Sequence, residues 1–299
     1  MDNRSYLEKY NEEHSSVVAS LNINKRIFVR LLGFLICSVI YFLIYIISKE
    51  RGSHDIQTQF LNTFVNSIMI CSYIIAFIFL VCCVLIRTNK KISVKFDEVK
   101  FKIKKTLFFV LDWLVILPIC ATVASFCFAF LFTFAQVDGD SMYPTVYNES
   151  TVFVSYLEEV ERFDVVVAYI TPEDNLVSSS YGTEYYIKRI IGLPGDKLTW
   201  EKGVLTINGK VVDETYFDEV TKQSFKQYWE RGTEFNGLFK YKEDGTICES
   251  YTIPEGYYFV MGDNRTGSND SRQIGLIPYY NVEGVVKFEI GTSGIERVE

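Results

Sequence analysis

Two residues in the second half of the chain could together carry out nucleophilic catalysis. Ser141 lies in a turn-like segment, Val137-Asp-Gly-Asp-Ser-Met-Tyr-Pro-Thr145, and Lys188 lies among apolar and aromatic residues in Tyr185-Tyr-Ile-Lys-Arg-Ile-Ile-Gly192. A lysine that points into an apolar interior has a lowered pKa, because burial disfavours the charged amine. A neutral lysine amine can take the proton of a serine hydroxyl, whose oxygen then attacks a carbonyl carbon.

The composition of this half leaves few other routes to an activated serine. Both histidines, His14 and His54, precede residue 136, and Cys248 is the single cysteine that follows it. Histidine-assisted catalysis, a disulfide within this half and a cysteine-rich zinc cluster are therefore excluded there, and we predict neither a metal nor a cofactor. Each residue also has a simpler interpretation: Ser141 in a polar turn after a membrane span, and Lys188 at a solvated strand edge.

A third segment, Val260-Met-Gly-Asp-Asn-Arg-Thr-Gly-Ser-Asn-Asp-Ser-Arg272, follows an apolar run and holds two Asp, two Arg and two Ser. By itself it fits a solvated turn with local side-chain hydrogen bonds. The three segments together are far more specific than any one of them.

Together, these segments resemble the type I signal peptidases, membrane-bound Ser-Lys endopeptidases that release exported proteins. The stretch 139–145 resembles the nucleophile box of that family, 186–196 its general-base box and 262–272 its C-terminal signature. Arg162-Phe-Asp-Val-Val-Val167 resembles a further strand motif, with Phe163 where the family commonly has Gly. The resemblance covers about residues 130–290.

The resemblance implies a role for each matched residue of the catalytic centre. Ser141 takes the position of the nucleophile and Lys188 that of the general base. Ser268 matches a serine whose hydroxyl orients the lysine amine. Gly139 stands where some members carry a hydroxyl residue in the oxyanion hole, so backbone N–H groups, chiefly that of Ser141, are expected to serve there.

Four charged residues are expected to support this centre. The resemblance implies that Asp270 and Arg272 form a structural ion pair beneath it. It also implies that Asp263 and Arg189 are supporting charges.

The same half of the chain predicts a mostly β domain, residues 136–299. Apolar, β-branched and aromatic runs separated by Gly, Pro, Asn and Asp predict strands at 151–156, 163–170, 185–192, 204–207, 257–261 and 284–290. Residues 198–210 predict two successive hairpins, the second with an Asn208-Gly209 turn. We expect an insertion at about 213–250, with a helix at 216–230.

Three apolar stretches precede this domain and predict about three transmembrane helices, at 31–48, 64–86 and 107–135. Asp112 in the last of them fits a helix contact or an interfacial position better than a functional role.

Charge predicts the orientation of these spans. The loop 87–106 is strongly basic and should stay in the cytoplasm, as should the N-terminal segment 1–30. The short loop 49–63 and the β domain are then extracytoplasmic. This half carries 15 Lys/Arg against 28 Asp/Glu, a net charge of −13, whereas residues 1–135 carry a net charge of +6. A nucleic-acid binder is therefore excluded.

These features predict a plasma-membrane endopeptidase, bacterial by the Ser-Lys pairing, that cleaves signal peptides from exported preproteins. The resemblance implies small residues at positions −1 and −3 before the cut. Its partners would be preproteins and the lipid bilayer, and the sequence leaves the oligomeric state open. Two alternatives stay open: a peptidase dedicated to surface or pilus substrates, and a non-catalytic, membrane-tethered binding or assembly factor.

Overall fold

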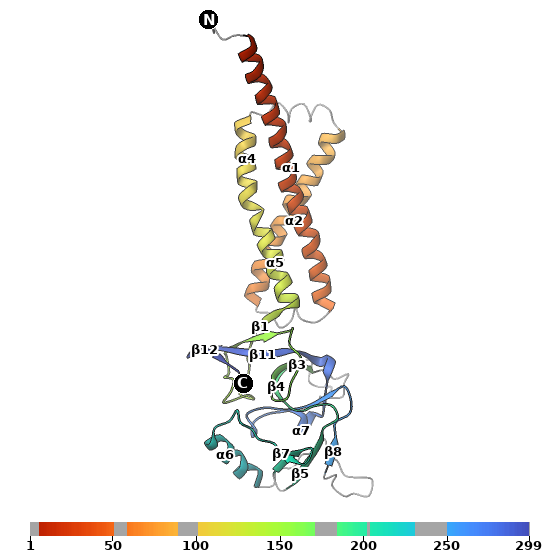
Figure 1. The fold of residues 1–299 in the computed structure, drawn as a ribbon, viewed down its shortest axis with the longest axis vertical. Coiled ribbons are helices and arrows are strands. Elements are labelled where there is room, and N and C mark those ends of the chain that lie inside the picture. The colour runs from red at the N-terminus through yellow and green to blue at the C-terminus, as the bar shows by residue number, and fades with distance from the viewer. Residues whose placement is uncertain are drawn as a thin grey trace. The chain divides into compact units, whose positions relative to one another are not determined.

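The computed structural model describes residues 6–50, 59–88, 101–170, 184–201, 204–230 and 250–298. These residues form two compact units, a helical unit up to Ala129 and a β unit from Phe130 onward (Figure 1). Each unit is described separately below.

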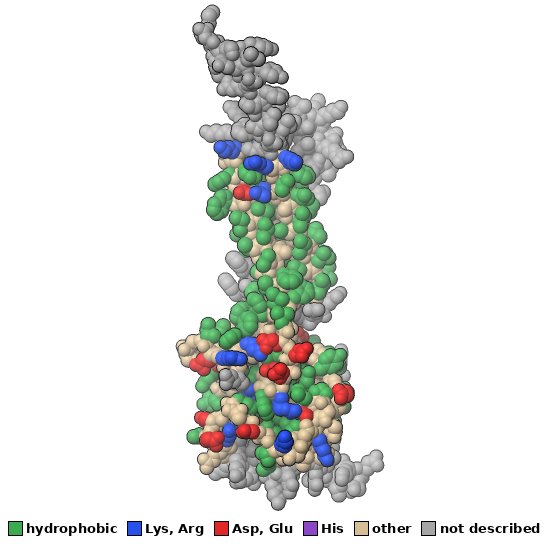
Figure 2. Space-filling model, viewed as in Figure 1, with side chains coloured by type: hydrophobic (Ala, Val, Ile, Leu, Met, Phe, Trp, Pro, Cys, Tyr) green, Lys and Arg blue, Asp and Glu red, His purple; other side chains and the backbone are tan. Residues whose placement is uncertain are grey.

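The helical unit is built from long apolar helices. Its elements are α1 (Tyr6–Glu50), α2 (Gln59–Thr88), α4 (Phe101–Leu114) and α5 (Ile116–Phe130). Helix α1 packs against both α2 and α4, and the buried side chains Phe34, Ala76 and Leu111 belong to one apolar cluster of this unit. Most of the other apolar side chains of these helices are exposed (Figure 2), as expected for helices surrounded by lipid.

A proline explains the interruption between α4 and α5. Pro118 lacks a backbone N–H and therefore leaves the carbonyl group of Leu114 without its usual helical donor. The helix breaks at Val115, one residue after Leu114, and resumes at Ile116.

The structure does not confirm the number of predicted membrane spans, and it corrects the end of the last one. Within the described residues, two stretches are long and apolar enough to cross a bilayer, Lys25–Ile47 and Ile103–Phe130, while the apolar stretch identified in α2 is shorter, Asn66–Phe79. The predicted span 107–135 is too long at its end, because the helix stops at Phe130 and Phe132–Gln136 form strand β1. An apolar strand that follows an apolar helix has the same hydropathy as a continuation of that helix.

The β unit contains an antiparallel eight-stranded sheet in the order β1-β2-β11-β3-β4-β9-β10, with β12 paired to β11. The strands are β1 (Phe132–Gln136), β2 (Thr151–Ser155), β3 (Val165–Ile170), β4 (Glu184–Gly192), β9 (Tyr257–Met261), β10 (Ile277–Pro278), β11 (Val282–Gly291) and β12 (Gly294–Arg297). The mostly β architecture is confirmed, and the predicted strands of this sheet form within a few residues of their expected ends.

Strand β3 shows why this sheet has a core on both faces. Its residues Val165–Ala168 are all buried, and successive side chains point to opposite faces. Val165 and Val167 pack in one apolar cluster, whereas Val166 and Ala168 pack in another. Strand β4 lies next to β3 and away from the sheet edges, so its side chains are held between covered faces.

A smaller four-stranded sheet extends the unit, in the order β7-β6-β5-β8. Its strands are β5 (Lys197–Glu201), β6 (Val204–Ile207), β7 (Lys210–Val211) and β8 (Ser250–Thr252). Both predicted hairpins form, and Asn208 and Gly209 have φ angles of 54° and 77°, as a type I′ turn requires. The predicted helix is α6 (Glu219–Glu230), and residues 231–249 of the expected insertion lie outside the described residues.

Candidate active site

The turn between β1 and β2 places Ser141. Gly139 has a φ of +98°, a conformation that suits glycine, and its N–H donates to Asn148 Oδ1 at 2.7 Å. Tyr143 N–H donates to the carbonyl of Asp140, and Met142 is buried in the apolar cluster beneath the turn. Among the described residues the N–H of Ser141 donates no hydrogen bond, so it is available to an incoming oxygen atom.

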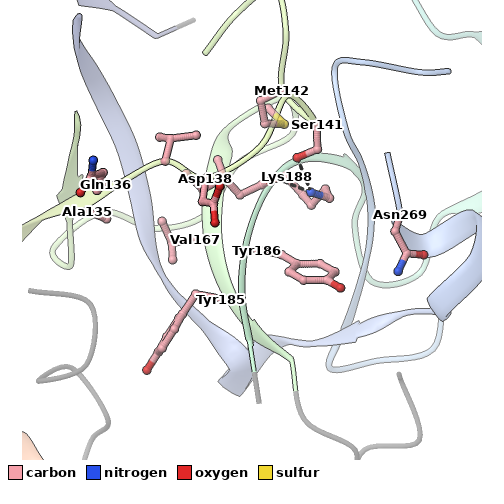
Figure 3. Close-up of a pocket in the computed structure, with 12 residues that line it drawn as sticks. Ala135, Gln136, Asp138, Ser141, Met142, Val167, Tyr185, Tyr186, Lys188 and Asn269 are labelled. Carbon is pink, nitrogen blue, oxygen red and sulfur yellow. Dashed lines mark hydrogen bonds between the residues drawn. The ribbon is translucent and has the colours of Figure 1, made fainter. Parts of the chain in front are cut away.

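Lys188 is buried in the middle of β4, with 3% of its surface exposed. Strand β4 pairs with β3 on one side and β9 on the other, so the alternative of an edge lysine is wrong. The Lys188 amine donates to Ser141 Oγ at 2.9 Å and to the carbonyl oxygen of Ile187 at 2.8 Å (Figure 3). The structure thus brings together the two residues proposed as nucleophile and base, 47 positions apart in the chain.

The protonation of this lysine follows from its surroundings. Burial lowers the pKa of the Lys188 amine to about 8, against the raising effects of Asp270 and Asp263 and with a further lowering by Arg272. The two hydrogen bonds of the amine go to a hydroxyl and a carbonyl rather than to a carboxylate. A substantial fraction of Lys188 is therefore neutral near pH 8, as a general base must be.

The segment after β9 contacts the turn that carries Ser141. Asn264 N–H donates to the carbonyl of Ser141 at 3.0 Å, and Asn264 Nδ2 donates to the carbonyl of Asp140 at 3.1 Å. A Cβ atom at Gly262 would lie 2.5 Å from the carbonyl oxygen of Ser141 and would clash with Ser268. Gly262 is thus required for the close approach of the two segments, a role that the sequence did not assign to it.

Ser268 lies beside this contact, but the structure does not contain the hydrogen bond expected of it. Its side chain is buried, and its Oγ has no hydrogen-bond partner among the described residues. The orienting role of Ser268 toward Lys188 therefore remains a prediction.

Asp270 and Arg272 form the expected ion pair. Arg272 Nε and Nη2 each donate to one carboxylate oxygen of Asp270 at 2.7 Å, and both side chains are buried. Asp270 also accepts the N–H of Gly262 at 2.9 Å, and Arg272 donates to the carbonyl of Arg265. The pair therefore fixes the backbone on both sides of the turn that contacts Ser141.

Arg189 and Asp263 form a second, fully buried pair, with Arg189 Nη2 2.6 Å from Asp263 Oδ2. Arg189 also donates to the carbonyl of Phe163 at 2.7 Å, and its guanidinium lies 3.9 Å from the centre of the Tyr216 ring. Phe163, which stands where glycine was expected, has a φ of +75°. The pair links β4 to the segment after β9.

The sequence did not predict a role for a third buried arginine, Arg265. Arg265 forms an ion pair with Glu214, donates to Tyr216 Oη at 3.1 Å and lies over the ring of Phe217. The sequence placed residues 214–217 in an insertion, whereas they pack against the charged layer behind the site. The only available signal was the acidic and aromatic composition of this stretch, which does not identify its partner.

A cleft of about 590 Å³ opens beside the Ser141–Lys188 pair. Its walls are formed by side chains of β1, β3 and β4, and Gln136, Asp138 and Asn269 are polar lining residues (Figure 3). The lining residues are Ala135, Gln136, Val137, Asp138, Ser141, Met142, Val167, Tyr185, Tyr186, Ile187, Lys188 and Asn269. Within the described residues, no group of three or more His, Cys, Asp or Glu side chains could hold a metal ion.

Comparison with known proteins finds relatives of one kind. The chain is 36% identical over 184 residues to signal peptidase I S of Bacillus subtilis (strain 168), covering 60% of this chain and 88% of that protein. It is 32% identical over 178 residues to signal peptidase I of Streptococcus pneumoniae, covering 54% and 83% respectively. A crystal structure of a signal peptidase I from Enterococcus faecalis matches with 30% identity and a TM-score of 0.29, covering 43% of this chain and 97% of that one.

The match to the family model covers all three segments of the candidate site. The model of the family described as signal peptidase, peptidase S26, matches residues 110–290, which include Ser141, Lys188 and Ser268. Because this range is more than half of the chain, the chain belongs to the signal peptidase family, peptidase S26, whose members are serine endopeptidases.

Proposed function

We propose that this chain removes signal peptides from exported preproteins with Ser141 as nucleophile and Lys188 as general base. The observation that carries the proposal is the 2.9 Å hydrogen bond between the Lys188 amine and Ser141 Oγ in a buried, largely apolar site. A non-catalytic binding factor would have no need of a buried lysine aimed at a serine hydroxyl.

The reaction proceeds in two steps. Neutral Lys188 accepts the Ser141 proton as Oγ bonds to the scissile carbonyl carbon, and the resulting oxyanion is stabilised by the free N–H of Ser141. The C–N bond then breaks, and the leaving amine takes the proton from the Lys188 ammonium. A water molecule, deprotonated by the same lysine, attacks the acyl-enzyme and restores the Ser141 hydroxyl.

The cleft suits an extended peptide. Strand β1 lies at one end of the strand order of the eight-stranded sheet, and its last residues and those that follow it line the cleft. An extended substrate can pair with such an edge and place alternate side chains in the cleft. Val137, Val167 and Ile187 are among its lining residues, and we propose that they select small residues at positions −1 and −3, because larger side chains would clash with them.

The helical unit supports a membrane location. Stretches Lys25–Ile47 and Ile103–Phe130 have the length and composition of membrane spans, and α2, at 30 residues, is about 45 Å long. We propose a multi-pass topology with three spans, in which the basic ends are cytoplasmic and the β unit is extracytoplasmic. Ser141 then follows the last helix by eleven residues and acts near the membrane surface.

A preprotein cleavage assay tests the proposed activity. The full chain in detergent is incubated with a preprotein that carries an Ala-x-Ala site, and the new N-terminus is sequenced. Wild type should cut after the second Ala, and Ser141→Ala should lose activity while melting like wild type. Ser224→Ala, which removes an exposed serine hydroxyl on α6, is the matched control and should cut normally.

Two outcomes distinguish the alternatives. Cleavage that persists in Ser141→Ala would contradict the mechanism. Failure of folded wild type to cut several general preproteins, with cleavage of one surface or pilus subunit, would identify a dedicated peptidase.

A further inference from the structure

A second cavity lies in the helical unit, far in sequence from the residues of the peptidase site, and its lining combines cationic residues with apolar surface. It has a volume of about 270 Å³ and is lined by Lys25, Arg26, Val29 and Arg30 of α1 and by Phe108 of α4. Lys25 and Val29, like Arg26 and Arg30, are four residues apart and therefore project from neighbouring positions of the same helix side. Three of the five lining residues are cations.

These cations are only partly neutralised by the protein. Arg30 Nη2 pairs with Asp112 of α4 at 2.6 Å, which confirms Asp112 as a helix-contact residue. Among the described residues, neither Lys25 nor Arg26 has a carboxylate partner. The Nε of Arg30 is also buried without a hydrogen-bond partner in this part of the chain. Among the described residues, the lining of the cavity therefore has an excess of positive charge.

The surroundings of the cavity are amphipathic. The apolar stretch of α1 begins immediately after Arg30, and Val29 and Leu107 are 49% and 42% exposed. In the space-filling view, charged side chains gather at one end of the helical unit and hydrophobic side chains cover the rest of its described surface (Figure 2). Such a boundary places a charged headgroup at the cations and an acyl chain along the apolar side chains.

We propose that this cavity binds the phosphate of an anionic glycerophospholipid. Lys25 and Arg26, which are both exposed, neutralise the phosphate, and the acyl chains leave over Val29. The inference uses the proposed membrane location of the helical unit but does not depend on the peptidase chemistry.

Binding of defined lipids to the full chain tests this site. The chain in detergent is titrated with phosphatidylglycerol or phosphatidylcholine, and bound lipid is measured by native mass spectrometry. Wild type should bind phosphatidylglycerol at least tenfold more tightly. Lys25→Gln/Arg26→Gln should weaken that binding roughly 30-fold, because each interfacial cation contributes about a fivefold gain in affinity for an anionic lipid.

Two control variants make the test specific. Lys105→Gln removes an exposed cation of α4 that does not line the cavity, and it should change binding by less than threefold. Lys25→Arg/Arg26→Lys exchanges the two residues, keeps both charges, and should bind like wild type. An equal loss in both double variants would show that altered packing, rather than lost charge, weakens binding, and would overturn the proposal.

Three further results would also overturn it. Equal affinity for phosphatidylcholine would show that the cavity does not select charge. A loss of about fivefold in Lys105→Gln, the same as that expected for each lining cation, would show a diffuse basic surface instead of a site. Displacement of phosphatidylglycerol by inorganic phosphate at equal concentration would identify a soluble anion as the ligand. Because none of these measurements uses cleavage, an inactive peptidase would not be mistaken for a failed lipid site.

Discussion

Strand β4 carries two adjacent buried cations whose environments differ. Lys188 is 3% exposed and Arg189 is fully buried, and adjacent side chains of a strand point to opposite faces. Arg189 has both oxygens of Asp263, the carbonyl of Phe163 and the ring of Tyr216 around its guanidinium. The Lys188 amine has a hydroxyl, a carbonyl and, 5.0 Å away, the ring of Tyr186 around it, and none of these is a carboxylate.

This difference separates a structural cation from a chemical one. A buried charge that is paired and hydrogen-bonded stays charged, whereas a buried lysine without a carboxylate in contact loses its proton more readily. Arginine also keeps its proton under all conditions a protein experiences, whereas lysine is readily deprotonated when buried. One strand thus positions a permanent charge that organises the turn after β9 and an amine that can act as a base.

The largest effect is expected when this chemical difference is abolished. Lys188→Arg keeps a cation at the position but removes the base, since a guanidinium does not release its proton. Turnover of a preprotein should fall at least about 10³-fold. Retention of more than a tenth of wild-type turnover by the folded variant would show that Lys188 is not the base.

The next largest effect is a loss of stability, expected when the buried pair of Arg189 and Asp263 is broken. Asp263→Asn leaves the buried Arg189 charge without its counter-ion and should lower the free energy of unfolding by about 3–5 kcal/mol. Denaturant unfolding of the full chain in detergent measures this loss. As a matched control, Glu219→Gln removes an exposed partner of Lys222 and should change stability by less than about 0.5 kcal/mol. Equal losses in the two variants would refute the structural role of the buried pair.

Lys188→Met should raise the free energy of unfolding at pH 7, whereas Asp263→Asn should lower it. Burial lowers the pKa of Lys188 from 10.5 to about 8, so the unfolded chain binds a proton more readily and wild-type stability rises with pH between about 8 and 10.5. Below pH 8 that stability is absent, and the variant, which buries no charge, should be about 3 kcal/mol more stable than wild type at pH 7.

The same unfolding experiment across pH checks this prediction. The advantage of Lys188→Met over wild type should shrink as the pH rises from 8 to 10.5. A variant that is less stable than wild type at pH 7 would mean that Lys188 is a structural cation like Arg189.

Local patterns predicted most of the β unit, and the resemblance of three segments to a known family predicted the site. Apolar, β-branched and aromatic runs predicted β2, β3 and β9, and the apolar neighbours of Lys188 indicated a strand, although not its central place in the sheet. The pairing of Asp270 with Arg272 needs only a two-residue separation, so a motif can encode it.

Contacts between distant segments could not be predicted in this way. Glu214 and Arg265 are 51 positions apart, and neither residue's neighbours specify the other. Strand β1 was merged into the preceding helix because hydropathy measures apolar content and not backbone conformation. Its pairing with β2 is a tertiary property.

The most direct test of the central claim is the pH dependence of kcat/KM for preprotein cleavage between pH 6 and 10. This profile reports the pKa of the essential base in the free enzyme. If Lys188 is the buried base described above, kcat/KM should rise about tenfold per pH unit below a midpoint near 8 and then level off. A midpoint near 10.5, the ordinary value for a solvated lysine, or a flat profile across this range would contradict the account.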